Sequence, residues 1–198
     1  MRLASHIFVA EKAATIIEQQ VGVTFHHKFL QLGACMPDIQ PLRRIQLHGP
    51  KLVGQHFDRE YNRIVFHSKK IERISFIIGI LSHYIADAFC LSHNLYTVDM
   101  KKHIQYEHLL DQYKTNMILP REFNNNVEDK INILAQSDES ISDYITSINT
   151  EYLATVKDLT WEQIMPIDME QAILHSASLL SHFIFELQRI PVPAVSMA

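Results

Sequence analysis

Residues 74–91, ISFIIGILSHYIADAFCL, constrain the fold more than any other stretch, because they are almost wholly apolar and yet contain His83 and Asp87. The stretch approaches the length of a membrane-spanning helix, but a histidine and an aspartate in hydrocarbon are costly unless they face a polar cavity. Polar groups buried inside a protein need partners as well. We therefore expect a buried central helix of a globular protein, not a transmembrane segment, with something that compensates both side chains.

Apolar residues recur at helical spacing along most of the chain. Ile7, Ala10, Ala14 and Ile17 form one such stripe, and the 198 residues include only five glycines and no recurring strand alternation. The sequence therefore predicts an all-α, multi-helix single domain over residues 1–198, with helical completion over 117–190. Further helices are expected at about 25–34, 52–67, 70–90, 100–117, 126–135, 139–157 and 161–188. Breaks are expected at residues 36–38, in a loop holding Pro41, Gly49, Pro50 and Gly54, at 120–126 and at Pro166.

Charge and cysteine content narrow the classes of partner and compartment. The formal net charge is −4, and residues 121–170 hold eleven acidic side chains against three basic ones, so no nucleic-acid track is expected. Cys35 and Cys90 form no CxxC pair and read as free thiols. No secretory signal follows Met1, which favours a cytoplasmic location. Oligomeric state is not predicted.

Two histidine–carboxylate pairs with the same spacing carry the chemical signal. His83 and Asp87 lie four residues apart on one helical face, and His103 and Glu107 repeat that spacing. Imidazole and carboxylate ligands so placed suit a divalent cation, zinc above all. His93, six residues after Asp87, points about 120° away on a continuous helix and suits a second metal better. Ten of the twelve histidines lie at or before His108, so the metal ligands are expected within residues 1–110.

Five sequence blocks extend this pattern: SHIFVAEKA, LGACMPDI, GQHFD, GILSHYIADAFCLSHN and HIQYEHLL. In this order they resemble the zinc-dependent phospholipase C and P1/S1 nuclease superfamily, and most closely the short bacterial zinc-dependent phospholipase C-like proteins. The resemblance covers about residues 1–115, and the rest matches only in being helical.

The resemblance implies a mostly helical fold whose cleft holds three zinc ions, and for this chain two to three zinc ions are expected. The first zinc would be held by Asp38, His56, His83 and Asp87, with His48 as the alternative to His56. The second, more exposed zinc would be held by His93, His103 and Glu107. The third would be held by His6, by Asp87 as a bridge to the first, and by the amino group and carbonyl of the N-terminal residue, here Met1. If Met1 is formylated, removed or extended, that third site is incomplete.

The function implied is hydrolysis of a phosphodiester, in which zinc-activated hydroxide attacks phosphorus and Asp38 serves as general base. The expected substrate is a phosphodiester small molecule or a phospholipid headgroup. A single-strand nuclease or 3′-nucleotidase is the alternative enzyme, and a non-catalytic metal-binding domain is the alternative outside catalysis. Structural zinc sites are closed and catalytic ones keep an open position, so the second zinc, with three proposed ligands, favours an enzyme.

Overall fold

The computed structural model describes residues 1–40, 50–67, 70–94 and 99–189, and regular structure within them is entirely helical. The predicted all-α fold is therefore confirmed for this part of the chain. The α-helices are α1 (Leu3–Val21), α2 (His27–Ile39), α4 (Pro50–His67), α5 (Ile71–Ala88), α6 (Leu91–Asn94), α7 (Met100–Tyr113), α8 (Phe123–Gln136), α9 (Ile141–Val156) and α10 (Trp161–Arg189), with a 3-10 turn, η1 (Lys114–Asn116), after α7.

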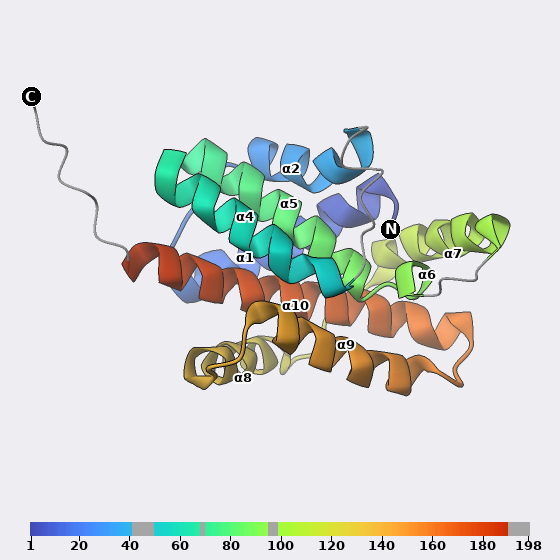
Figure 1. Cartoon of the computed structure of the whole chain (residues 1–198). Helices are drawn as coiled ribbons and strands as arrows, with labels where there is room; N and C mark the ends of the chain where they lie inside the picture. The colour runs from blue at the N-terminus through green and yellow to red at the C-terminus, as the bar shows by residue number, and fades with distance from the viewer. Residues whose placement is uncertain (41–49, 68–69, 95–98, 190–198) are drawn as a thin grey trace, which may run out of the picture.

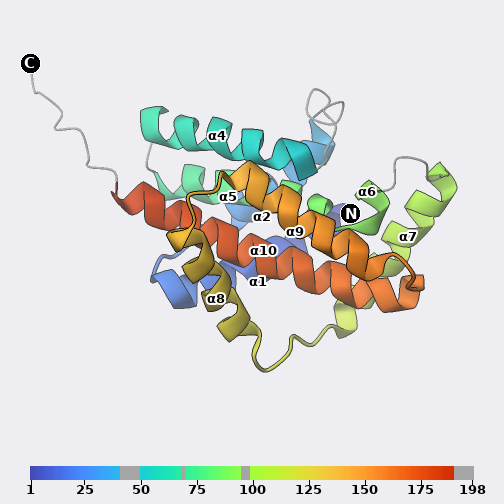
Figure 2. The same cartoon turned by 60° about the horizontal axis from the view of Figure 1, so that its bottom comes forward.

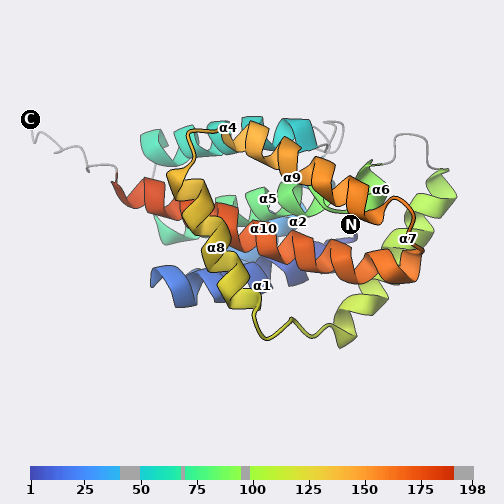
Figure 3. The same ribbon diagram turned by 90° about the horizontal axis from the view of Figure 1, so that it is seen from below.

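Helices α5 and α10 form the centre of the bundle. The long α10 runs across the molecule and packs against α1, α5 and α8 (Figure 1). Helix α5 packs against α1, α2, α4 and α10, and α4 also contacts α9. Seen from below, α8 crosses α10 at a steep angle, and α7 lies at the end of the bundle where α6 is also found (Figure 3).

Most of the apolar stretch at residues 74–91 lies within α5, which ends at Ala88. Every residue from Ile77 to Ala88 is buried, including His83 and Asp87. No helix within the described residues is both long and apolar enough to cross a membrane. The prediction of a buried central helix is confirmed, and His83 and Asp87 lie in its buried part.

Two glycines allow α2 and α5 to approach closely. A Cβ on Gly33 would lie 2.0 Å from the carbonyl oxygen of Phe76, and one on Gly79 would lie 2.1 Å from that of Leu30. Real Cβ atoms do not come so near a backbone, so any larger residue would force the helices apart. This contact brings the C-terminal end of α2, where Asp38 lies, beside His83 on α5.

Two predicted breaks are wrong. Helix α2 continues through Pro37 to Ile39, and α10 continues through Pro166. Each proline removes one backbone donor from its helix, but both helices are held by packing, since Pro37 is buried and buried Ile164 and Met165 directly precede Pro166. Pro50 and Gly54 lie within α4, and α8 already begins at Phe123. Pro41 and Gly49 lie outside the described residues.

Candidate metal centre

The two histidine–carboxylate pairs meet at one end of the bundle. The C-terminal end of α5, the short helix α6 and helix α7 lie there beside the N-terminus of the chain (Figures 1 and 2). Their ligand atoms form two groups, and in each group these atoms lie within 4.8 Å of one another. The first group is His6, His83 and Asp87, and the second is His93, His103 and Glu107.

The first group is closed to solvent. The side chains of His6, His83 and Asp87 are all 0% exposed. His6 Nε2 lies 3.3 Å from Asp87 Oδ1, and His83 Nε2 lies 3.2 Å from Asp87 Oδ2. The two imidazoles are stacked with their centroids 3.6 Å apart. We call these three residues the closed group.

The second group is more accessible. Glu107 Oε1 lies 3.1 Å from His93 Nε2 and 3.1 Å from His103 Nε2. The side chains of His93, Glu107 and His103 are 18%, 15% and 26% exposed. We call these three residues the open group. A metal held here could also contact a substrate, as catalytic sites with an open position do.

Backbone carbonyls orient one histidine in each group. His83 Nδ1 lies 2.8 Å from the carbonyl oxygen of Ala34, and His103 Nδ1 lies 3.1 Å from that of Ser92. Because a carbonyl can only accept, Nδ1 is the donor in both cases. In the neutral ring the lone pair is then on Nε2, the atom that faces the carboxylates. Metal-binding histidines in proteins are commonly oriented in this way.

The amino group of Met1 lies between the two groups. It donates to Asp87 Oδ1 at 2.9 Å and lies 2.9 Å from Glu107 Oε1 and 2.7 Å from His93 Nε2. The resemblance seen in the sequence implied that Met1 binds the same zinc as His6. In the structure its nitrogen contacts the open group as well, through His93 and Glu107.

Asp38 and His56, which the resemblance assigned to the first zinc, have different neighbours in the structure. Asp38 Oδ1 lies 3.8 Å from His83 Nε2 and its Oδ2 lies 4.0 Å from His6 Nε2, with the side chain 32% exposed. His56 stacks on Tyr84 with centroids 3.6 Å apart, and its Nδ1 lies 2.8 Å from Arg59 Nη2. Among the described residues, neither Asp38 nor His56 belongs to either group. Their roles as metal ligands therefore stay predictions. The alternative, His48, lies outside the described residues.

Burial and mutual charge set the protonation of the site. Burial and the neighbouring His83 lower the pKa of His6 well below its ordinary value, and burial also lowers the pKa of His93. Burial alone would raise the pKa of Asp87, but His93, the amino group and His6 hold it well below the usual range. Hydrogen bonding and the amino group likewise outweigh burial and lower the pKa of Glu107 to about 2. Neutral imidazoles and ionised carboxylates are the forms that bind metals.

These residues fit zinc. Both ring nitrogens of His6 are buried and make no hydrogen bond to any described residue, which is costly unless another partner supplies the interaction. The donor set of imidazole nitrogens and carboxylate oxygens is the one that zinc prefers. The structure brings His6, which the resemblance assigned to a third zinc, together with His83 and Asp87 of the first. These three residues would hold one ion, and His93, His103 and Glu107 would hold another.

Comparison with known families agrees with this chemistry. A family model described as zinc dependent phospholipase C matches residues 5–159. The chain belongs to the zinc-dependent phospholipase C family. The resemblance to zinc-dependent phospholipase C is thereby confirmed, but its expected extent of about residues 1–115 was too short, because the match continues to residue 159. The match includes every proposed ligand except Met1. No curated protein and no solved structure matches the chain.

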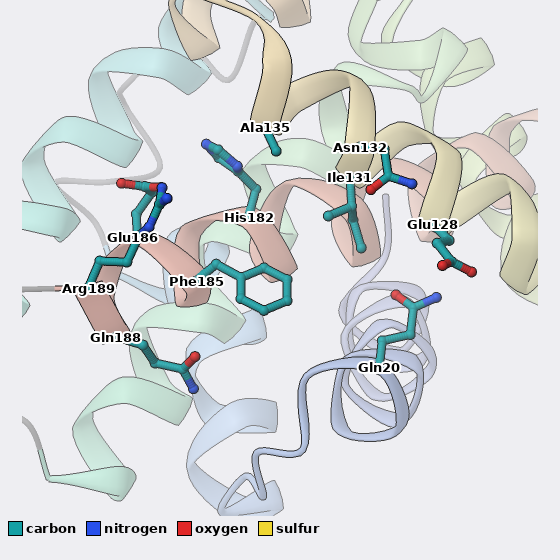
Figure 4. Close-up of a pocket in the computed structure, with 10 residues that line it drawn as sticks. All are labelled: Gln20, Glu128, Ile131, Asn132, Ala135, His182, Phe185, Glu186, Gln188 and Arg189. Carbon is teal, nitrogen blue, oxygen red and sulfur yellow. The ribbon is translucent and has the colours of Figure 1, made fainter.

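A groove lies away from the candidate metal centre. It has a volume of about 680 Å³ between α1, α8 and α10, with Gln20, Ile131, His182 and Phe185 among its lining (Figure 4). Gln20 is near the opposite end of α1 from Met1, and no member of the closed or open group lines the groove. The groove is therefore separate from the candidate metal centre.

One residue that supports the centre was missed in the sequence. Asp168 of α10 is fully buried and hydrogen-bonded to the first residue of α6, the helix that carries His93. The signal was an isolated aspartate among Ile167, Met169 and Ala172 on an apolar helix. Such a residue must have polar partners, but the sequence does not say which.

Proposed function

We propose that this chain is a zinc-dependent phosphodiester hydrolase of the phospholipase C type. The observation that carries the proposal is the pairing of a closed and an open group at one place, linked by Asp87. Bound zinc would supply a hydroxide nucleophile at neutral pH and would neutralise charge on the phosphoryl oxygens. A closed group alone would suit a structural metal, whereas the open group leaves room for a phosphodiester.

The side chains of the site would divide the remaining work. Asp87 and Glu107 supply the negative charge that holds cations in place, and their carbonyl-bonded neighbours His83 and His103 keep fixed orientations. Asp38 reaches the site from the end of α2 and is 32% exposed, so solvent can reach its carboxylate. We assign it the role of proton acceptor from the attacking water, because it is the carboxylate near the closed group that solvent also reaches.

The surface beside the open group supports an amphiphilic substrate. On α7, Met100 and Ile104 are 68% and 60% exposed, next to the exposed Lys101 and Lys102. Apolar and basic side chains side by side suit a ligand that has both hydrocarbon and phosphate. This favours a phospholipid headgroup over a nucleic acid as the substrate.

The test combines metal analysis with hydrolysis assays on protein whose N-terminus is an unblocked Met1, verified by intact mass. We expect at least two zinc ions per chain, because there are two groups, and hydrolysis of bis-nitrophenyl phosphate and of short-chain phosphatidylcholine. The matched control is His103→Ala, which should lose metal from the open group and lose hydrolysis.

Three results would contradict this proposal. One zinc or none after zinc supplementation would leave a structural or degenerate member of the family. Full zinc occupancy without cleavage of any phosphodiester would indicate a non-catalytic metal-binding domain. Cleavage of single-stranded oligonucleotides or 3′-nucleotides in preference to phospholipids would favour the nuclease alternative.

A further inference from the structure

The position of α6 needs an explanation, because a helix of four residues has no stability of its own. It carries His93, whose Nε2 contacts both Asp87 and Glu107. A shift of His93 by about 1 Å would spoil ligand geometry, since zinc–nitrogen distances are held near 2.0–2.1 Å. Whatever fixes α6 therefore fixes the open group.

Asp168 is hydrogen-bonded to α6 itself and to two other helices, α7 and α9. Its Oδ2 accepts from the backbone N–H of Leu91 at 2.8 Å and from the hydroxyl of Tyr106 at 2.7 Å. Its Oδ1 accepts from the hydroxyl of Tyr152 at 2.6 Å. Leu91 begins α6, Tyr106 is on α7 and Tyr152 is on α9.

Two of these three partners stand next to ligands of the open group. Leu91 is two residues before His93, and Tyr106 directly precedes Glu107. A single atom, Oδ2 of Asp168, is thus hydrogen-bonded both to α6, which carries His93, and to α7, which carries Glu107. A buried carboxylate with three donors is well satisfied, and such a network rigidifies what it connects.

Amides from α6 and α9 complete the restraint. Asn94 donates to the carbonyl oxygens of Ala88 and Cys90, each at 2.9 Å. Asn149 of α9 donates to the carbonyl oxygen of Ala88 at 2.6 Å and to Asn94 Oδ1 at 3.1 Å. These bonds fix the turn between α5 and α6, but neither amide reaches α7. Asp168, by contrast, is hydrogen-bonded to both α6 and α7, and so adds to the contact that His103 Nδ1 of α7 makes with the carbonyl oxygen of Ser92 of α6.

We propose that Asp168 is a positioning residue that sets the geometry of the open group from the last helix of the fold. It lies beyond residues 5–159, the part of the chain that matches the family. Its three hydrogen bonds go to Leu91, Tyr106 and Tyr152, none of which is a proposed metal ligand, and it acts through Leu91 and Tyr106. The inference rests on the proposed function only in so far as the open group binds a metal.

The test is the metal affinity of the open group, measured by cobalt titration with absorption spectroscopy in the background His83→Ala, which disables the closed group. Asp168→Asn keeps the size of the side chain, but it replaces one carboxylate oxygen, which accepts hydrogen bonds, with an NH₂ group, which donates them. That NH₂ group would face at least one of the three donors, Leu91, Tyr106 and Tyr152. We expect the substitution to weaken cobalt binding about 10- to 100-fold, the usual effect of losing a partner that supports metal ligands, and to change the visible spectrum of the bound ion.

A tyrosine pair supplies the matched control. Tyr106→Phe removes a hydroxyl that bonds to Asp168 and should weaken cobalt binding in the same direction. Tyr144→Phe removes the hydroxyl of a buried tyrosine that makes no hydrogen bond to any described residue, and should leave the affinity unchanged. If Asp168→Asn does not fold, this pair decides the question.

Two outcomes would overturn the inference. One is an Asp168→Asn protein with a lower unfolding temperature but unchanged cobalt affinity and spectrum, which would make Asp168 merely structural. The other is equal cobalt affinity in Tyr106→Phe and Tyr144→Phe. Failure of the wild-type protein to hydrolyse a phosphodiester would refute the proposed function alone, because the titration does not measure hydrolysis.

Discussion

Asp87 Oδ1 lies 3.3 Å from His93 Nε2, although the two residues belong to different helices and to different metal-binding groups. The other oxygen of the same carboxylate lies 3.2 Å from His83 Nε2. One buried side chain therefore contacts both the closed and the open group. A change in its charge should therefore affect metal binding in both groups, whereas a change in His103 should affect binding in one.

This sharing predicts different metal losses for two variants. Asp87→Asn removes the charge common to both groups and should reduce zinc in both, while His103→Ala should reduce zinc only in the open group. Hydrolysis should fall at least about a hundredfold in each, since metal stabilisation of the transition state contributes several kcal/mol. Plasma mass spectrometry and a phosphodiester assay check this. An Asp87→Asn protein that keeps its full zinc content would show that Asp87 is no bridge.

Removal of zinc should lower the unfolding temperature. The metal binds the folded state, in which the buried nitrogens of His6 make no hydrogen bond to any described residue. Free zinc at 100 times its dissociation constant would stabilise the fold by about 2.7 kcal/mol. Differential scanning calorimetry with and without a chelator measures the shift. The double variant His83→Ala/His103→Ala is the control, and an equally large shift in that protein would place the zinc elsewhere.

The close contact of α2 and α5 predicts an unusual cost for a glycine-to-alanine change. In a helix this substitution ordinarily stabilises by about 1 kcal/mol. Gly33→Ala should instead destabilise by about 3 kcal/mol or more, because its Cβ would lie 2.0 Å from a backbone oxygen. It should also weaken the closed group, since Ala34 and Asp38 follow on the same helix.

Gly22→Ala is the control for that measurement. Gly22 has a positive φ of 71°, and a Cβ added there would meet nothing within 4 Å, so only backbone strain of about 1–2 kcal/mol is expected. Urea denaturation compares the free energies of unfolding. Equal losses in the two variants would mean that α2 can move away from α5 without cost.

The two thiols should differ in reactivity. Cys90 is fully buried, and burial raises its pKa to about 12. Cys35 is partly exposed, and its pKa is raised by burial and by the nearby Asp38. Only the thiolate reacts, so iodoacetamide at pH 8 should label Cys35 well before Cys90. Peptide mass spectrometry follows both sites, with denatured protein as the control for equal labelling. Equal rates in the folded protein would show that the turn between α5 and α6 opens readily.

The local patterns of this sequence determined the class of fold and the types of ligand. Helical periodicity and few glycines predicted an all-α chain, and the buried course of α5 followed from its apolar run. The pairs His83–Asp87 and His103–Glu107 could be predicted because a spacing of four residues fixes two side chains on one helical face. The resemblance to the family rested on short sequence blocks, two of which contain these pairs.

Only the tertiary structure decided how these pairs combine. Helical spacing is a local property, whereas the contacts of Met1 with Asp87 and of Asp168 with Leu91 join residues far apart in the sequence. Tertiary packing also keeps α2 and α10 helical at Pro37 and Pro166, although proline disfavours the interior of a helix. It likewise places His56 against Tyr84. Such contacts depend on how whole helices pack, because burial of apolar surface sets the distance and angle between them.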